Sequence, residues 1–317
     1  MKLPIRLLNT ITCFILIATC GTSLFSDVFD HLKKAEGKGE NHSMKNVDFI
    51  YVINLDKRPE KYEMTAKQLQ QYGINPYRFS AVNGWELSLD EINDIGIRYN
   101  PNTMKNNLMA TTYDASFAPS IPHHEIMNVP SRTYFCHTMS RGAIGIILSH
   151  LSIIQDAYDS GYSTIWVMED DIEIIKNPNK ISKMISKLDR TVGAKKWDML
   201  FTDRDTKGQD GKYIMCLSYA LRPNWDPIDP TRFQKRQEIR ADFIKIGARY
   251  GAYSFILRRS GMKKLLNFFK TYGVFLPFDM EFYLPEGINI YTVQDDIVST
   301  IPQALSDNGA PRYQQNQ

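Results

Sequence analysis

The stretch from residue 49 to residue 55 reads Phe-Ile-Tyr-Val-Ile-Asn-Leu, an almost continuous apolar run. Such a run is typical of a strand that is buried on both faces of a parallel sheet. Pro59 then suits the first position of a helix that ends at Gly73, and a second strand is predicted over residues 77–82. This strand–helix–strand order predicts a crossover unit of an α/β sheet.

The same alternation continues along the chain. A helix is predicted over residues 142–159, and a second helix begins after Ser260. Further strands are predicted over residues 164–168, 197–202, 252–257 and 288–293. We therefore expect one α/β domain, residues 47–309, with a mostly parallel central sheet flanked by helices. Residues 99–140 lack periodicity and contain four prolines, so we expect a long loop there, functional or disordered.

Composition excludes several classes of protein. The 38 Lys and Arg residues and 35 Asp and Glu residues leave a net charge of +3, which argues against a nucleic-acid binder. A hydrophobic content of 43% is that of a globular protein and excludes collagen, coiled-coil and disordered chains. The four cysteines are too few for a disulfide scaffold and have no zinc-binding spacing.

The N-terminus predicts a targeting segment. Lys2 and Arg6 precede an apolar run over residues 7–18, and small residues follow, which is typical of a secretory signal peptide over residues 1–26. The alternatives are an uncleaved membrane anchor, a lipoprotein signal ending at Cys20 and a buried helix. Residues 27–46 are predicted to be a tethering linker and residues 310–317 a polar tail. The expected location is a membrane or a secretory or periplasmic compartment, with the cytosolic face of a membrane as the alternative.

Three consecutive acids follow the predicted strand at residues 164–168. Glu169, Asp170 and Asp171 would repel one another by about 4 kcal/mol per pair at 4 Å and an effective dielectric constant of 20. Because ligands bind at the carboxyl ends of strands in open α/β sheets, this cluster predicts a site for Mg²⁺ or Mn²⁺. A solvated acidic loop and a helix N-terminus are the structural alternatives.

Two other strand ends carry polar groups. Asn54, Asp56 and Arg58 follow the first strand and have the donors and acceptors that a nucleotide needs. Asp203 and Asp205 follow the strand over residues 197–202 and form a rival metal site. A strand-end Asp also suggests a metal-dependent phosphohydrolase, although Lys207 departs from the usual pattern of such enzymes.

The stretch 51–61, Tyr-Val-Ile-Asn-Leu-Asp-Lys-Arg-Pro-Glu-Lys, resembles the opening motif of glycosyltransferase family 25, the lipooligosaccharide galactosyltransferases and their collagen-modifying relatives. Residues 168–171, Met-Glu-Asp-Asp, resemble the family's acidic metal motif. Further blocks resemble the family in the same order at residues 79–84, 142–150, 251–261, 277–279 and 306–307. The resemblance thus spans nearly all of the chain after residue 48.

The resemblance implies a GT-A fold and a metal-dependent, inverting transfer of a hexose, with galactose expected, from a UDP-sugar to a saccharide or glycolipid such as lipopolysaccharide. Mn²⁺ or Mg²⁺ would be held by Asp171 with help from Glu169 or Asp170. Asp279 is the first choice for the general base, with Asp295 or Asp296 second and a helix N-cap as its alternative role. The residues assigned to the donor are Asn54, Asp56, Arg58, Asn83, Gly84, Ser149 and His150.

Some features depart from this pattern or leave alternatives open. Asn83 stands where the family usually has Asp, which makes a non-catalytic, sugar-binding relative conceivable. His150 has apolar helical neighbours, so a hydrogen-bonded histidine at the edge of the core is as well supported as a donor contact. Residues 232–264 contain ten basic and two acidic side chains, which predicts either an anionic acceptor or membrane surface or an ordinary solvated face.

Overall fold

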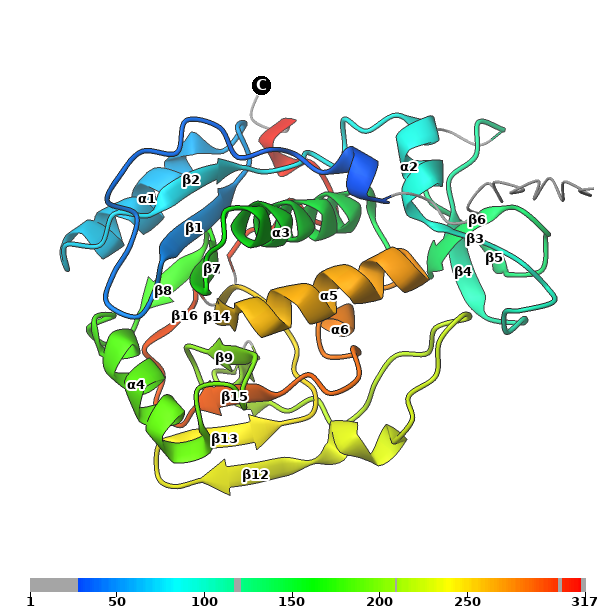
Figure 1. The fold of residues 1–317 in the computed structure, drawn as a ribbon. Helices are drawn as coiled ribbons and strands as arrows, with labels where there is room; N and C mark the ends of the chain where they lie inside the picture. The colour runs from blue at the N-terminus through cyan, green and yellow to red at the C-terminus, as the bar shows by residue number, and fades with distance from the viewer. Residues whose placement is uncertain (1–27, 117–120, 209, 302–303, 315–317) are drawn as a thin grey trace, which may run out of the picture.

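The computed structural model describes residues 28–116, 121–208, 210–301 and 304–314. Its centre is an eight-stranded sheet with the order β12-β13-β15-β9-β14-β7-β1-β2 (Figure 1). In that order the strands are Arg236–Ile239, Phe243–Ile246, Ile290–Val293, Met199–Phe201, Ser254–Arg258, Thr164–Glu169, Phe49–Asn54 and Tyr77–Ser80. All the strands predicted from the sequence lie in this sheet.

The sheet is mixed, with most strands pointing one way. β1 pairs in parallel with both β2 and β7, and β15 pairs in parallel with β9. β14 is antiparallel to both of its neighbours, and β13 is antiparallel to β12 and β15. Four of the seven neighbouring pairs are therefore antiparallel, and the predicted mostly parallel sheet is confirmed in part: all strands except β13 and β14 point the same way.

Helices cover both faces of the sheet (Figure 1). The helices are α1 Pro59–Gln70, α2 Leu89–Ile95, α3 Arg141–Asp159, α4 Lys180–Val192, α5 Arg259–Tyr272 and α6 Phe278–Glu281. Short 3₁₀ helices occupy Val28–His31, Pro230–Gln234 and Arg312–Gln314. The predicted helices at residues 59, 142 and 260 are confirmed, whereas α2 and α4 were not predicted.

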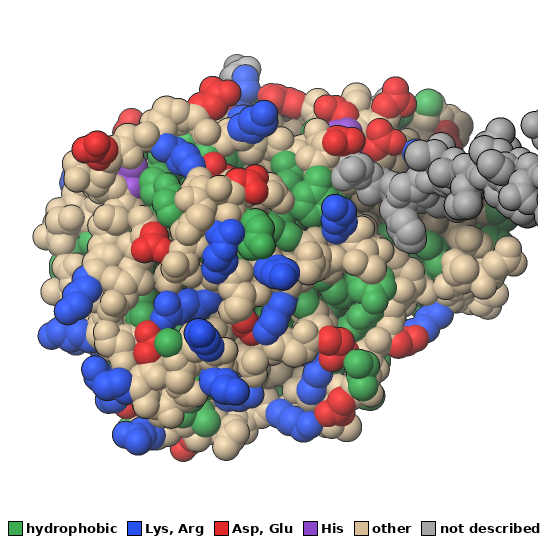
Figure 2. All heavy atoms as spheres, in the orientation of Figure 1, with side chains coloured by type: hydrophobic (Ala, Val, Ile, Leu, Met, Phe, Trp, Pro, Cys, Tyr) green, Lys and Arg blue, Asp and Glu red, His purple; other side chains and the backbone are tan. Residues whose placement is uncertain are grey.

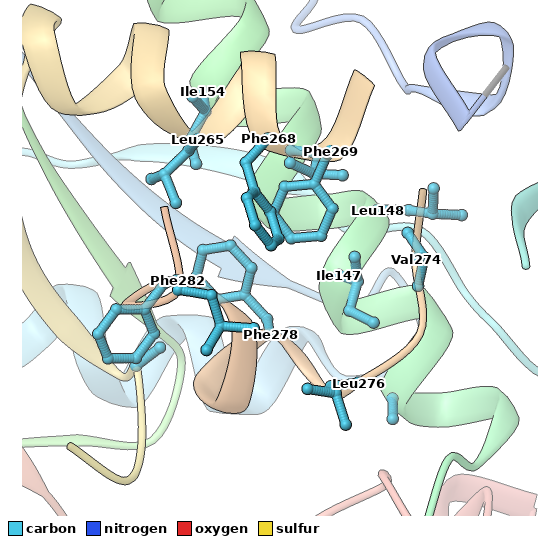
Figure 3. Packing of buried hydrophobic residues seen from close by; sticks show 14 of the residues in the cluster. Ile147, Leu148, Ile154, Leu265, Phe268, Phe269, Val274, Leu276, Phe278 and Phe282 are labelled. Carbon is cyan, nitrogen blue, oxygen red and sulfur yellow. The ribbon is translucent and has the colours of Figure 1, made fainter. Parts of the chain in front are cut away.

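Alternate residues of β1 enter two different cores. Tyr51 and Ile53 belong to the cluster packed under α3 and α5, while Ile50 and Val52 belong to the cluster packed under α1 and α4. Burial on both faces explains the continuous apolar run at residues 49–55. Figure 3 shows the larger core, where Ile147 and Leu148 of α3 and Phe268 and Phe269 of α5 lie near Phe278 and Phe282. These aromatic rings fix α6 beneath the edge of the site described below.

Residues 97–136 are not the irregular loop that the sequence suggested. They contain a four-stranded antiparallel sheet in the order β3-β6-β4-β5. Its strands are Ile97–Arg98, Thr133–Cys136, Met109–Thr112 and His123–Ile126. Two smaller pairs, β8 Ile172–Ile174 with β16 Val298–Thr300 and β10 Thr206–Lys207 with β11 Tyr213–Ile214, complete the fold. Strands of two to four residues are too short to show alternation in a sequence.

The segment before β1 packs against the domain instead of forming a free tether. Val28 is fully buried, and Lys38 binds Asp156 of α3 at 2.8 Å. The predicted signal or anchor at residues 1–26 lies outside the described residues, as does the end of the polar tail. Within the part of the chain that is described, no helix is both long and apolar enough to cross a bilayer. Cys136 and Cys216 are buried free thiols.

Candidate functional site

A cavity of about 100 Å³ opens at the carboxyl ends of β1 and β7. The two strands are parallel neighbours, with Val52 opposite Met168 and Ile53 opposite Glu169, so their last residues meet at one edge of the sheet. Nine of the predicted site residues line this cavity: Asn54, Arg58, Asn83, Gly84, Ser149, His150, Glu169, Asp170 and Asp171. The structure therefore brings together the donor-binding and acidic groups predicted from separate motifs.

The three acids at the end of β7 lie close together, partly buried, and repel one another. Burial raises the pKa of Glu169 well above its usual value, and repulsion from Asp171, Asp170 and Asp279 adds to the effect. Burial also raises the pKa of Asp170 to about 6 and raises the pKa of Asp171. Oδ1 of Asp171 is buried without a hydrogen-bond partner. A cluster of this kind is poised to accept positive charge.

Asp170 is held in place by neighbours from β1 and α1. The amide Nδ2 of Asn54 donates to Oδ2 of Asp170 at 2.6 Å, and Nζ of Lys61 lies 4.0 Å from Oδ1. Asn54 is itself fully engaged, because it also donates to the carbonyl of Arg58 and accepts from Nε of Arg78. Asn54 thus lines the cavity mainly as the residue that orients Asp170.

His150 is a neutral imidazole at the cavity floor. Its Nδ1 donates to the carbonyl of Ile146 at 3.0 Å, and its ring stacks on Phe278 with 4.2 Å between centroids. Burial lowers the pKa of His150 to about 4, so the ring is uncharged at neutral pH. Its Nε2 has no hydrogen-bond partner and lies 3.8 Å from Oε1 of Glu169. His150 therefore presents a free acceptor nitrogen beside the acids.

The loop after β2 approaches α3 closely because both sides use glycine. A Cβ on Gly84 would lie 1.8 Å from the carbonyl oxygen of Arg141, and one on Gly145 would lie 2.6 Å from the carbonyl oxygen of Val82. Ser149 of α3 accepts from the amide of Val82 at 2.9 Å. Asn83 accepts from the amide of Trp85 and donates to the hydroxyl of Tyr313. These contacts fix the wall of the cavity opposite the acids.

Asp56 is the one donor-binding residue of the prediction that does not line the cavity. It is exposed, forms an ion pair with Arg78 at 3.0 Å and accepts from Ser80 at 2.5 Å. These contacts place it in a neighbouring surface groove with Lys33. A role for Asp56 in binding a ligand of the main cavity has no support in this geometry.

Asp279 does not line the cavity and lies in the first turn of α6. Pro277, not Asp279, is the N-cap residue of that helix, and no side chain caps it, so the N-cap role is excluded. Oδ2 of Asp279 accepts from the amide of Gly251 at 3.2 Å, and its charge is close enough to raise the pKa of Glu169. Burial raises the pKa of Asp279 itself, which suits a proton acceptor working near neutrality.

The second-choice bases are engaged elsewhere. Asp295 is 84% exposed and pairs with Lys176 at 3.0 Å. Asp296 is nearly buried, where it binds Lys207 at 2.6 Å and the amide of Arg204 at 2.8 Å. Neither residue lines the cavity.

The rival acidic pair after β9 is neutralised inside the protein. Asp203 is fully buried and binds Arg249 at 2.6 Å and Tyr253 at 2.5 Å. Asp205 forms an ion pair with Arg236. Because one oxygen of each carboxylate binds an arginine, these residues are poor candidates for a metal site or for a phosphohydrolase nucleophile, although Oδ1 of Asp205 has no partner.

The basic stretch at residues 232–264 is also largely compensated within the domain. Six of its ten basic side chains form ion pairs: Arg232 with Glu286, Lys235 with Asp229, Arg236 with Asp205, Arg249 with Asp203, Arg258 with Asp189, and Lys264 with Asp198. Figure 2 shows Lys and Arg side chains gathered over α4 and the adjoining part of α5, whose first residues, 259–264, belong to this stretch. Lys180, Lys183 and Arg190 of α4 are exposed there.

Eleven of the twenty residues that line the cavity were not predicted as site residues, and four of these carry a charged, amide or indole side chain. Lys61, Trp85, Asp307 and Asn308 line the cavity together with the predicted groups. Lys61 lies three residues after Arg58, and this spacing indicates that the two side chains lie on the same face of a helix. Asp307 reaches the site from 249 residues beyond Arg58, and only its place in a block resembling the family pointed to it.

A divalent cation fits the chemistry of the acids, with an incomplete set of protein ligands. The free Oδ1 of Asp171 and the raised pKa of Glu169 leave carboxylate oxygens for a hard cation. Among the described residues, however, no three His, Cys, Asp or Glu side chains are arranged to hold a metal by themselves. The protein would therefore supply one or two ligands, and a bound diphosphate and water the others.

Comparison with known proteins gives a family match over most of the chain. Residues 47–281 match the model of glycosyltransferase family 25, described as an LPS biosynthesis protein. A "Glycosyltransferase 25 family member" of Drosophila melanogaster is 26% identical over 178 residues, which cover 56% of this chain and 24% of that relative. A protein of the same name from Aedes aegypti is 27% identical over 177 residues, covering 55% of this chain and 24% of the relative.

Some of the similar proteins are named as inactive. The human "Inactive glycosyltransferase 25 family member 3" is 25% identical over 191 residues, which cover 55% of this chain and 27% of that protein. In these comparisons the chain matches only about a quarter of the length of each relative.

Proposed function

Because the chain belongs to glycosyltransferase family 25, we propose that it transfers a hexose, with galactose the first candidate, from a UDP-sugar to a saccharide or glycolipid acceptor. The observation that carries this proposal is the cavity at the ends of β1 and β7. It gathers uncompensated acids, two basic side chains and a neutral histidine in one place. We further propose that the sheet and its flanking helices form a GT-A fold.

The charges of the cavity support dependence on a divalent cation. When all four acids are ionised, Glu169, Asp170, Asp171 and Asp307 face two basic residues among the lining side chains, Arg58 and Lys61, which gives a formal charge of 2 − 4 = −2. A nucleoside diphosphate would be repelled by such a site. Asp171 with Glu169 would hold Mn²⁺ or Mg²⁺, which when bound neutralises charge on the diphosphate.

In the proposed reaction, Asp279 accepts the proton of the acceptor hydroxyl. The hydroxyl oxygen forms a bond to the anomeric carbon while the bond from that carbon to UDP breaks, and UDP leaves with the electron pair. Arg58 and Lys61 bind the phosphates, and Asn83 is placed to contact the ribose. His150 offers an acceptor nitrogen to a donor hydroxyl. Attack opposite the leaving group inverts the anomeric centre.

We further propose a lipopolysaccharide-like acceptor and a location at a membrane or in an exported compartment. A lipopolysaccharide-like acceptor is supported by the description of the family model. Residues 1–26 would hold the protein at a membrane if they act as an anchor. They would direct its export if they act as a cleaved signal peptide. An anchor that leaves the domain cytosolic would place it where bacterial UDP-sugars are made.

Incubation of the full chain with UDP-hexoses and Mn²⁺ tests the proposal. We expect slow hydrolysis of one donor without any acceptor, and loss of that hydrolysis in Asp279→Asn or after chelation of the metal. Absence of both hydrolysis and UDP-sugar binding would refute the enzyme assignment.

A non-catalytic sugar-binding protein is the alternative that the inactive-named relatives favour. It predicts donor or sugar binding with no turnover in the same assay. Hydrolysis of phosphomonoesters that Asp203→Asn abolishes would instead indicate a phosphohydrolase.

A further inference from the structure

The C-terminal segment, residues 304–314, forms one side of the cavity and carries an acid into it. Trp85 donates through Nε1 to the carbonyl of Asp307 at 2.9 Å, and Ser140 donates to the carbonyl of Asn308 at 2.6 Å. Gly142 packs so tightly against this segment that a Cβ there would lie 2.3 Å from the carbonyl oxygen of Asn308. Figure 1 shows the segment in red beside α3. These contacts define where the side chain of Asp307 lies.

Asp307 contacts both basic side chains of the cavity. Its Oδ2 accepts from Nη1 of Arg58 in an ion pair and lies 3.9 Å from Nζ of Lys61. Lys61 also donates to the carbonyl of Leu305 at 2.8 Å, so the segment binds this side chain twice. The Asp307 side chain is only 7% exposed.

One oxygen of Asp307 has no partner. Oδ1 is buried without a hydrogen bond, although the residue lines the cavity. Asp205 and Glu281 also pair with arginines and leave one buried oxygen without a partner, but neither lines the cavity, whereas Asp307 does. Its location among the cavity cations suggests a role connected with what those cations bind.

We propose that Asp307 is an internal counter-anion of the donor site. It occupies Arg58 and Lys61, the two cations that a diphosphate needs, and thereby weakens diphosphate binding until a divalent cation compensates the acids. This inference rests on the proposed function for the identity of the ligand as a nucleoside diphosphate. It adds to that function the claim that Asp307, which lies outside the acidic motif at residues 169–171, is part of the reason why diphosphate binding requires a divalent cation.

The charges of the side chains that line the cavity predict whether removing Asp307 strengthens or weakens diphosphate binding. Removing the charge of Asp307 changes the formal charge of the lining side chains from −2 to −1 and takes one carboxylate away from both Arg58 and Lys61, which leaves Arg58 paired with Glu60 and Lys61 near Asp170. We therefore expect Asp307→Asn to bind a diphosphate more tightly without metal, by about tenfold. A residue that positions Arg58 for the ligand would have the opposite effect, because its loss would weaken binding.

The test measures binding of inorganic pyrophosphate and of UDP to the full chain by calorimetry, with and without Mn²⁺. Asp307→Asn should bind pyrophosphate about tenfold more tightly than the unmodified protein in the absence of metal. It should also gain less affinity from added Mn²⁺. Unchanged or weaker metal-free binding by this variant would overturn the proposal.

Two variants serve as controls for charge and position. Asp295→Asn makes the same chemical change at a carboxylate that is exposed and does not line the cavity, so we expect unchanged affinity. Asp307→Glu keeps the charge and should retain the metal requirement. Equal tightening in either control would show that position 307 and its charge are not responsible, and would reject the proposal.

The outcome is separable from that of the proposed function. If the unmodified protein with Mn²⁺ binds no UDP, the glycosyltransferase assignment fails, while the pyrophosphate comparison still decides the role of Asp307. Thermal unfolding checks that each variant is folded. Asp307→Ser replaces Asp307→Asn, with the same expected result, if the latter does not fold.

Discussion

Two strands of one sheet, β7 and β9, each end in acidic residues, and the molecule treats the two clusters in opposite ways. After β9, Asp203 binds Arg249 and Asp205 binds Arg236, so charges are matched inside the protein. Burial raises the pKa values of the acids in both clusters, but after β7 Glu169, Asp170 and Asp171 also repel one another and form no ion pair with any arginine that the structure describes. The comparison teaches that acids at a strand end form a candidate site where the fold leaves their charge uncompensated.

The largest expected effect is on catalysis at β7. Asp171→Asn should lower kcat/KM for Mn²⁺-dependent hydrolysis of the UDP-hexose by about 1000-fold, because metal-ion stabilisation contributes several kcal/mol. Its thermal stability should be unchanged or slightly higher, since one repulsive charge is removed. Activity retained in Asp171→Asn and lost in folded Asp203→Asn would reverse the roles of the two clusters.

At β9 the expected effect is on stability instead. Asp203→Asn leaves Arg249 buried and uncompensated, so we expect the free energy of unfolding to fall by about 3–5 kcal/mol in urea denaturation. The double variant with Arg249→Met should recover part of the loss, because both charges are then absent. Equal stability of Asp203→Asn and the unmodified protein would show that this pair is not the structural element inferred here.

A smaller effect should appear in the pH dependence of the metal-free protein. Burial raises the pKa of Asp170 from 3.8 to about 6, so the folded state holds this proton more tightly than the unfolded state. The stabilising contribution is fully present below about pH 4 and is lost as pH rises through about 6. Relative to Asp170→Asn, the unmodified protein should therefore lose about 2–3 kcal/mol of stability between pH 4 and pH 7. Parallel pH profiles of the two proteins would contradict the raised pKa.

Sequence patterns predicted the central sheet because its strands and helices are strongly periodic or continuously apolar. Helix α4, which was not predicted, also has apolar residues at helical spacing, Ile181, Ile185 and Leu188, and this pattern indicates a helix. Helix α2 begins with a capping box formed by Ser88 and Glu91, which is a local signal for the start of a helix. The sheet formed by β3 to β6 had no comparable signal, because its pairings are between distant short strands.

The site was predictable where neighbouring strands end together. Asn54 and Glu169 were placed at one sheet edge by the parallel pairing of β1 and β7. Partners that come from distant parts of the chain were not predictable. Arg249 lies 46 residues after Asp203, and Asp307 lies 249 residues after Arg58, so no local pattern distinguishes a paired acid from a free one.

Calorimetric titration of the full chain with UDP, with and without Mn²⁺, tests the central claim most directly. The account predicts that UDP binds strongly only when Mn²⁺ is present, and that Asp171→Asn loses this dependence together with the strong binding. Equal affinity with and without Mn²⁺, or no UDP binding under either condition, would contradict a cation-dependent donor site at the end of β7.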